Sequence, residues 1–558
     1  MHANRFIYKV FTRLIHKWST GWLVSIPLAL AGCGGTSGAS TESFGSGGGG
    51  SQLAVPDLGA VGVSTMASGL QAGWSQGPFM QIYVRAYQDS DGDGKGDLKG
   101  LIQRLDYLQD LGVKGLWLLP VNESSDRDHG YAVKNYRAIE PDYGSTADFE
   151  LLLAEAHKRG IGVIVDYVIN HISHQHPLFL NSSSSASNGQ RNYFLWQNPK
   201  PVGWQIYGQD PWYASNWANG FYFAGFSNTM PDFNWRATEV ASFHHDNLRY
   251  WLNKGVDGFR FDAVGNLVEN GASAWEVQPE NHVVMNNVRQ ILQQYSQRYM
   301  VCEAPANSLS FAQSNSCGSA FAFDLSSAIV GSAKGDTGAI QKLADYYKSR
   351  PNTLAPFVSN HDRFAGDRLW NQVQGNVAQY KLAAASYLLL PGTPFIYYGE
   401  EIGMAAADTL TGDWAIRTPM SWTSDAKGFS KGSPFRALSS NISAQNVAQQ
   451  LTDSASLHQH YKRLIGLRNA HVALSSGTYE GAWANQKTMG FQRVADQEKV
   501  MVVLNYDTAS ANVSIGRLVP GEQWSPLAGT SNTTVTANSS GVLQISMPAQ
   551  SFAVFKKN

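Results

Sequence analysis

Residues 256–264 read VDGFRFDAV. Successive side chains of a β-strand point to opposite faces, so Arg260 and Asp262 lie on the same side of this stretch. The neighbouring Phe259 and Phe261 point the other way, where helices would cover them. The stretch therefore predicts a buried strand whose carboxyl end carries an ionised, oriented aspartate.

Short apolar runs of this kind recur from about residue 78 onward. Amphipathic stretches such as LIQRLDYLQDLG (101–112) separate most of them, which is the rhythm of parallel strands joined by crossover helices. Eight such units predict an α/β fold, a (β/α)8 TIM barrel with its active site at the carboxyl ends of the strands. The predicted strands are residues 80–87, 113–121, 162–169, 256–264, 299–304, 320–325, 355–362 and 393–401.

Two segments depart from the barrel pattern. Residues 171–232 are rich in aromatic residues without regular periodicity, which predicts an inserted domain after the third strand. We expect most of these aromatic side chains to serve local packing, with stacking on sugar faces as the alternative. Residues 475–558 alternate in short runs and predict a C-terminal all-β sandwich domain. The barrel then consists of residues 76–170 and 233–474.

The first 33 residues are typical of a lipoprotein signal peptide. A basic region precedes the apolar run WLVSIPLALAG (22–32), which is shorter than the roughly 20 residues that span a bilayer. LAGC, ending at Cys33, resembles the lipobox of bacterial lipoproteins, in which the cysteine is lipidated. With Gly34 next, we expect export and anchoring at the outer membrane through the lipid alone; the alternative is an ordinary cleavable signal. Residues 34–75, rich in Gly, Ser and Thr, predict a flexible linker.

Composition excludes several classes of protein. Charged residues make up only 15% of the 558 residues, the net charge is -1 and aromatic residues reach 12%. These values argue against a nucleic-acid partner and against a disordered chain.

Only Cys302 and Cys317 remain after Cys33, so cysteines provide neither a disulfide framework nor a metal cluster. An exported chain can pair the two. We expect two unpaired thiols, because nothing in the sequence fixes their geometry.

Several predicted strands end in ionisable residues. Arg260 keeps Asp262 ionised, whereas Glu303, at the end of the apolar run YMVCEA, lies where burial raises the pKa of its carboxyl group. Asp362, beside His361, adds a third acidic group. One such residue is commonly a helix cap or an ion-pair partner, but two carboxyl groups with separated roles are the plan of glycoside hydrolysis.

At these strand ends the chain resembles the α-amylase family of glycoside hydrolases, over nearly all of residues 78–558. The matching stretches are DYVINH (166–171), GFRFDAVGN (258–266), VCEA (301–304), FVSNHD (357–362) and MPDFN (230–234), with HGY (129–131), GTPFIYYGEEIGM (392–404) and IRTPMSW (416–422) around them.

The resemblance implies a retaining mechanism. Asp262 would attack the anomeric carbon, Glu303 would act as acid and then base, and Asp362 would stabilise the transition state. The residues that match the sugar-holding positions at the cleavage subsite are Tyr131, as a stacking platform, and His171, Arg260 and His361.

Three positions depart from the family pattern. Ala132 and Asn135 replace aspartates, which affects local structure more than chemistry. Asn266 stands where many α-amylases have a histidine, so the resemblance does not fix the leaving-group contacts or the preferred substrate length.

MPDFN resembles an intermediary group that contains α-amylases, which favours α-1,4 cleavage of starch or malto-oligosaccharides. The main alternative is an exo-acting α-glucosidase or transglycosylase with the same three carboxylates. A binding protein that has lost catalysis is a remote alternative, because those three are all present.

The stretch DSDGDGKGDLKG (89–100) predicts a calcium site. Its spacing follows an EF-hand loop, but Gly100 replaces the bidentate Glu and no helix precedes the loop. We therefore expect a structural calcium in the first strand-to-helix loop; an ordinary Asp/Gly turn is the alternative. Asn170 resembles a ligand of a second calcium in many α-amylases. The predicted loop ligands are Asp89, Asp91, Asp93, the Lys95 carbonyl and Asp97.

Overall fold

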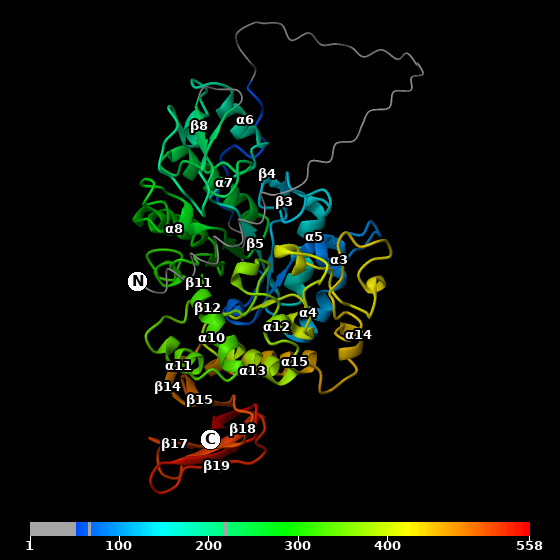
Figure 1. The fold of residues 1–558 in the computed structure, drawn as a ribbon, viewed down its shortest axis with the longest axis vertical. Coiled ribbons are helices and arrows are strands. Elements are labelled where there is room, and N and C mark those ends of the chain that lie inside the picture. Colours follow the sequence, from blue (N-terminus) through cyan, green and yellow to red (C-terminus); the bar gives the residue numbers. More distant parts are fainter. Residues whose placement is uncertain (1–51, 65–67, 216–219) are drawn as a thin grey trace.

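A computed structural model describes residues 52–64, 68–215 and 220–558 (Figure 1). The predicted signal peptide and Cys33 lie outside the described residues. Within the described ranges, no helix is long and apolar enough to cross a membrane.

The eight-stranded parallel barrel is confirmed. Its strands pair in the order β12-β11-β10-β9-β5-β2-β1-β13. The Phe395 N–H of β13 donates to Pro356 O, just after β12, at 3.0 Å and brings the two ends of the sheet together. The strands are β1 (Phe79–Ile82), β2 (Gly115–Leu118), β5 (Gly162–Tyr167), β9 (Gly258–Phe261), β10 (Tyr299–Cys302), β11 (Ala320–Phe321), β12 (Leu354–Ala355) and β13 (Phe395–Tyr397).

Helices cover the outside of the barrel between successive strands, as the amphipathic stretches predict. Their apolar faces pack on the outward side chains of the strands, among them Phe259 and Phe261 of β9. The main helices are α3 (Leu98–Gln103), α4 (Leu105–Leu111), α5 (Thr146–Lys158), α7 (Thr238–Asn253), α8 (Pro279–Leu292), α10 (Phe323–Ala333), α11 (Thr337–Asp345), α13 (Val377–Leu388) and α15 (Leu457–Ala470).

The barrel interior is filled by aromatic and aliphatic side chains. Trp117 of β2 and Phe321 of β11 lie four strands apart in the sheet, yet their ring centroids are 5.1 Å apart. Phe79 and Phe395 pack beside them at 4.9 Å. The barrel is therefore a packed core, and its chemistry lies at the strand ends.

Several strands are shorter than the sequence predicts. The run 80–87 leaves the strand after Ile82 and forms α2 (Val84–Tyr87), and the run 320–325 enters α10 at Phe323. A buried helix and a buried strand are equally apolar, so the apolar runs do not mark where one changes into the other.

The insertion after β5 forms a small subdomain. It contains α6 (Pro177–Ser184) and a three-stranded antiparallel sheet in the order β6-β8-β7, made of β6 (Trp196–Gln197), β7 (Trp212–Ala214) and β8 (Phe221–Phe223). A hairpin of β3 (Asn122–Ser124) and β4 (Val133–Ile139) precedes it along the chain. Figure 1 places the insertion and the C-terminal β-domain at opposite ends of the molecule.

The predicted C-terminal all-β domain is confirmed. A six-stranded sheet contains β14 (Thr478–Asn485), β15 (Thr488–Ala495), β16 (Glu498–Asn505), β18 (Gln523–Gly529), β19 (Val535–Thr536) and β21 (Ser551–Lys557). It packs on a two-stranded sheet of β17 (Ala511–Ile515) and β20 (Leu543–Met547) through a core around Val503, Val513 and Trp524.

Two buried arginines lie where the barrel meets this domain, and one of them, Arg493, joins the two. Arg493 of β15 donates to Leu389 O, at the end of α13, and to Gly477 O. Arg468 of α15 donates to Leu388 O and Leu390 O. Both guanidinium groups therefore satisfy backbone carbonyls where the barrel meets the β-domain.

The expectation of unpaired thiols is wrong. Cys302, the last residue of β10, forms a disulfide with Cys317 across 15 positions of the chain. The loop after β10 returns to the start of β11, where Cys302 N–H donates to Ser319 O, and this fold-back brings the two sulfur atoms together.

The predicted linker is not flexible throughout. Asp57 is fully buried and accepts from Tyr136 N–H at 2.8 Å and contacts His176 Nε2 at 2.9 Å. Asn181 binds the backbone of Leu53 through two hydrogen bonds. These tertiary contacts, which composition does not encode, fix residues 52–64 against the insertion and β4.

Candidate active site

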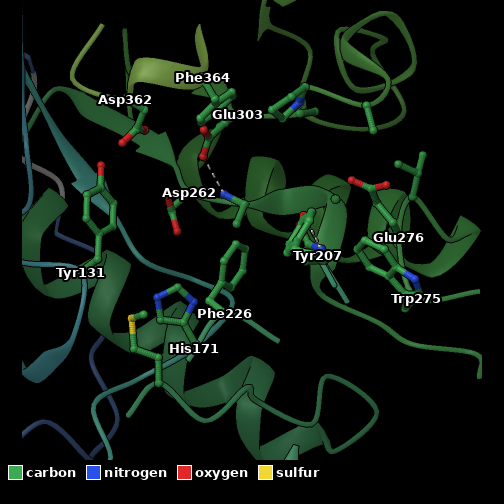
Figure 2. Close-up of a pocket in the computed structure, with 18 of the residues that line it drawn as sticks. Tyr131, His171, Tyr207, Phe226, Asp262, Trp275, Glu276, Glu303, Asp362 and Phe364 are labelled. Atoms are coloured by element: carbon green, nitrogen blue, oxygen red, sulfur yellow. Dashed lines mark hydrogen bonds between the residues drawn. The ribbon is translucent and has the colours of Figure 1, made fainter. Parts of the chain in front are cut away.

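A cavity of about 440 Å³ opens at the carboxyl ends of the barrel strands (Figure 2). Asp262 follows β9, Glu303 follows β10, and Asp362 follows β12, so the sheet order brings the three carboxyl groups together. Tyr131 and His171 also line the cavity. Arg260 and His361 are buried directly beside it.

Arg260 is the centre of the charge network. Only 1% of its surface is exposed, and it contacts carboxylates from three adjacent strands. Its Nη1 donates to Asp166 Oδ1 at 2.7 Å and to Asp262 Oδ1 at 2.8 Å. Its Nη2 lies 2.7 Å from Glu303 Oε2. One guanidinium group therefore orients two of the carboxyl groups that line the cavity, Asp262 and Glu303.

Burial gives the carboxyl groups of Asp262 and Glu303 different pKa values. It raises the pKa of Glu303 to about 8, against the opposing effect of Arg260. It raises the pKa of Asp262 to about 6, again opposed by Arg260. Near neutral pH, Glu303 holds a proton while Asp262 is ionised, which is the order expected from the sequence.

The backbone after Asp262 makes a tight change of direction. Ala263 has φ 46, a left-handed conformation that non-glycine residues adopt rarely. Its N–H donates to Glu303 Oε2 at 3.2 Å. The strained residue thereby joins the ends of β9 and β10, and strain of this kind is common at functional sites.

Asp362 has a cation of its own. Arg417 donates through Nη2 to Asp362 Oδ1 at 2.8 Å and through Nε to His361 O at 2.7 Å. Arg417 also lies 3.3 Å from Asp413, which lines the cavity. Asp362 is therefore held in place from a segment 55 residues further along the chain.

His361 and Tyr131 form a stacked pair. Their rings are 5.7 Å apart and nearly parallel. Gln81 Nε2 contacts His361 Nδ1 at 2.6 Å, which leaves the proton of the neutral ring on Nε2, 2.6 Å from the Tyr131 hydroxyl. That hydroxyl donates to Asp166 Oδ2. Burial lowers the pKa of His361 well below its ordinary value, so the ring stays neutral.

His171 is also neutral, because burial lowers its pKa to about 3. No described residue makes a hydrogen bond with its Nε2 atom. Its ring packs 5.3 Å from Phe226 and faces the cavity.

Four residues that the sequence interpretation did not assign belong to this site. Asp166 is the penultimate residue of β5, in register with Arg260 of β9, and its polar character within an apolar run was the available signal. Arg417 lies in IRTPMSW, whose pattern does not show what it contacts. Asp413 lies in a short 3-10 helix (Gly412–Ala415) and Glu276 in a loop, and both line the cavity.

The Asp/Gly loop follows α2 and lies apart from the cavity. Asp89, Asp91 and Asp97 each place a carboxylate oxygen within 4.8 Å of the others, an arrangement that fits a cation with oxygen ligands. Asp93 is not in this group, and its carboxylate contacts Lys95 Nζ at 3.3 Å. Gly94 is required, because a Cβ atom there would lie 1.9 Å from Ser433 O.

A second polar cluster surrounds Asn170. Asp232 and Glu269 are buried beside it, and burial raises the pKa of both, to about 8 for Asp232. Asn170 Oδ1 and Glu269 Oε2 have no hydrogen-bond partner among the described residues. A neutral amide oxygen and two carboxyl groups are ligand types that suit calcium.

A family model described as Alpha amylase, catalytic domain, matches residues 81–477. The chain belongs to the α-amylase family. It is 34% identical over 439 residues to Alpha-amylase 3 from Dictyoglomus thermophilum, covering 76% of this chain and 84% of that protein. It is 30% identical over 509 residues to an oligo-1,6-glucosidase from Parageobacillus thermoglucosidasius, covering 78% and 90%.

Solved structures agree with this family membership. The crystal structure of alpha-amylase from H. orenii superposes with a TM-score of 0.74 at 32% identity, covering 86% of this chain and 99% of that chain. The predicted family and the predicted class, a glycoside hydrolase, are confirmed.

Glu303 makes stability depend on pH. Because burial raises its pKa from 4.5 to about 8, the folded chain keeps a proton that the unfolded chain releases. Its contribution is present below pH 4.5 and is lost as the pH rises through about 8. We expect Glu303→Gln to melt at a higher temperature than the wild type at pH 9, with a smaller advantage at pH 5, in thermal unfolding at both values.

Exposed Glu239 provides the control for this measurement. Glu239→Gln should keep the wild-type pH dependence. An identical pH dependence for Glu303→Gln and the wild type would contradict the raised pKa.

Proposed function

We propose that this protein is a retaining α-amylase that hydrolyses α-1,4-glucosidic bonds in starch and malto-oligosaccharides. The observation that carries the proposal is the pair Asp262 and Glu303 on one guanidinium group, with pKa values of about 6 and 8. An ionised carboxylate beside a protonated carboxyl group is what a nucleophile and a general acid require.

The proximity of the two groups favours retention of configuration. Asp262 and Glu303 bind adjacent nitrogens of Arg260, and a hydrogen bond from Glu303 lowers the pKa of Asp262. An inverting enzyme instead separates its carboxyl groups by roughly 6.5–9.5 Å to admit water.

The reaction proceeds in two steps. Asp262 attacks the anomeric carbon while Glu303 gives its proton to the leaving oxygen, and the glycosidic bond breaks. Glu303, now ionised, takes a proton from water, which attacks the same carbon and releases Asp262. Asp362, oriented by Arg417, stabilises the positive charge that develops on the sugar. Tyr131 provides a stacking face, and neutral His171 and His361 provide hydrogen-bonding groups.

Relatives support two specificities. The proteins named alpha-amylase favour α-1,4 cleavage within a chain. Oligo-1,6-glucosidases and an α-glucosidase from Pediococcus pentosaceus, 29% identical over 525 residues, favour the second candidate, an exo-acting α-glucosidase or transglycosylase.

Timed product analysis on soluble starch, maltoheptaose, isomaltose and maltose tests the proposal. The wild type should reduce starch viscosity rapidly and release mixed short oligosaccharides. Asp262→Asn should lower the rate by about 10⁴-fold or more, because no covalent intermediate forms. Exposed Asp408→Asn should match the wild type. Glucose released alone from short substrates would favour the exo-acting candidate, and no product from the wild type would contradict both.

We further propose that calcium stabilises the fold. The loop trio of Asp89, Asp91 and Asp97 and the buried cluster of Asn170, Asp232 and Glu269 support two sites. A bound ion would screen the carboxylates from one another in each cluster.

A calcium chelator should lower the melting temperature, and added calcium should restore it. The expected loss is about 3 °C relative to calcium at about 100 times its dissociation constant. Asp89→Asn should reduce this loss of melting temperature if the loop binds calcium. Asp232→Asn should reduce it if the buried cluster binds calcium. An unchanged melting curve in excess chelator would count against both sites.

We propose from the sequence that the protein is exported and anchored to the outer membrane through lipidated Cys33. Its first 33 residues support this, with the basic region, the short apolar run and LAGC in order. Cys33→Ser should move the protein from the membrane fraction to the soluble fraction of the cell. Persistent membrane association of that variant would overturn the anchor.

A further inference from the structure

The cavity has two sides, one on each side of Asp262 and Glu303, and different residues line them. Figure 2 shows Tyr131 on one side of Asp262 and Glu303, and Tyr207, Trp275 and Glu276 on the other. With the bond to be cleaved between Asp262 and Glu303, the sugar that is attacked lies on Tyr131. The leaving sugar therefore lies against Tyr207, Trp275 and Glu276.

The loop that carries Glu276 is firmly anchored. Val277 N–H donates to Gly265 O at 2.7 Å, and Asn281 Nδ2 donates to the same oxygen at 2.6 Å. Val277 has φ 54, which is unfavourable for a β-branched residue. A Cβ atom at Gly265 would lie 3.8 Å from Glu276 Cγ, so the Glu276 side chain packs over Gly265. Gly265 follows Asp262 by three residues.

Glu276 differs from every other carboxyl group that lines the cavity. Within the described ranges, its carboxylate makes no hydrogen bond and no ion pair, although the residue is partly buried. Burial alone raises its pKa. The other lining carboxyl groups all contact an arginine: Asp262 and Glu303 contact Arg260, and Asp362 and Asp413 contact Arg417.

The aromatic rings of Tyr207 and Trp275 lie on the same side of the cavity as Glu276 (Figure 2). Trp275 meets Tyr207 edge to face, with centroids 5.1 Å apart, and Tyr207 lies 5.7 Å from Phe226. Asn266 Nδ2 donates to the Tyr207 hydroxyl at 3.2 Å, so Asn266 positions Tyr207. An apolar wall beside unpaired carboxylate oxygens suits a sugar, which presents an apolar face and adjacent hydroxyl donors.

We propose that Glu276 is a specificity-determining residue that accepts hydrogen bonds from adjacent hydroxyl groups of the leaving-group sugar, packed beside Tyr207 and Trp275. This inference rests on the proposed glycosidase function. It also explains why the Glu276 carboxylate has no hydrogen-bond donor among the described residues, since the substrate supplies the donors.

Leaving groups with and without adjacent hydroxyl groups test the assignment. Cleavage of maltotetraose releases a sugar as the leaving group. Cleavage of the aryl bond of 4-nitrophenyl α-maltotrioside releases nitrophenol, which has no adjacent hydroxyl groups. Glu276→Gln should lower kcat/KM for maltotetraose about tenfold, the usual effect of losing hydrogen bonds to a charged group. It should lower kcat/KM for nitrophenol release by about threefold or less.

Glu280→Gln is the matched control, because Glu280 is exposed, follows the same loop and does not line the cavity. It should match the wild type on both substrates. Glu276→Ala should show the same unequal loss, and melting temperatures identify any variant that fails to fold. Equal losses on both substrates, or none, for Glu276→Gln would overturn the assignment. A wild type inactive on both substrates would instead overturn the proposed function.

Discussion

The buried guanidinium group of Arg260 is the constraint on which the active site depends. A cation with 1% exposure requires compensating anions, and the strand order places three beside it, from β5, β9 and β10. Three carboxyl groups around one positive charge leave an excess of negative charge in a region shielded from water. Retaining a proton on Glu303 relieves that excess, so the protonated state that the proposed general acid requires is a consequence of the charge balance.

The remaining groups of the site are oriented by residues other than Arg260. Arg417 serves Asp362 and Asp413, and Gln81 fixes the tautomer of His361. Each of the three proposed catalytic carboxyl groups therefore contacts a buried arginine, with Asp262 and Glu303 sharing Arg260. Glu276, which contacts no cation among the described residues, lies on the side of the cavity proposed for the leaving group.

The sequence predicts what depends on local pattern. Alternation in GFRFDA places Arg260 toward the barrel interior and Phe259 and Phe261 toward the helices, as the structure has them. Asp262 and Glu303 follow strands, so the barrel alone brings them together. Contacts that depend on loop paths were not predictable in the same way. The disulfide of Cys302 with Cys317 and the docking of Asp57 against Tyr136 arise from tertiary contacts, which no periodicity encodes.

The C-terminal β-domain is more than an appended module. Arg493 reaches out of its sheet to bind Leu389 O at the end of α13, the helix that precedes β13. Arg468 binds Leu388 O and Leu390 O on the same stretch from the barrel side. Removing the β-domain would take away the Arg493 donor to Leu389 O at the end of α13, just before the strand that closes the barrel, while Arg468 would still bind Leu388 O and Leu390 O. Shortened chains that end near Gly477 would therefore lose this hydrogen bond to the barrel along with the domain. A chimeric chain with an exchanged domain would keep it by supplying an arginine at the same place.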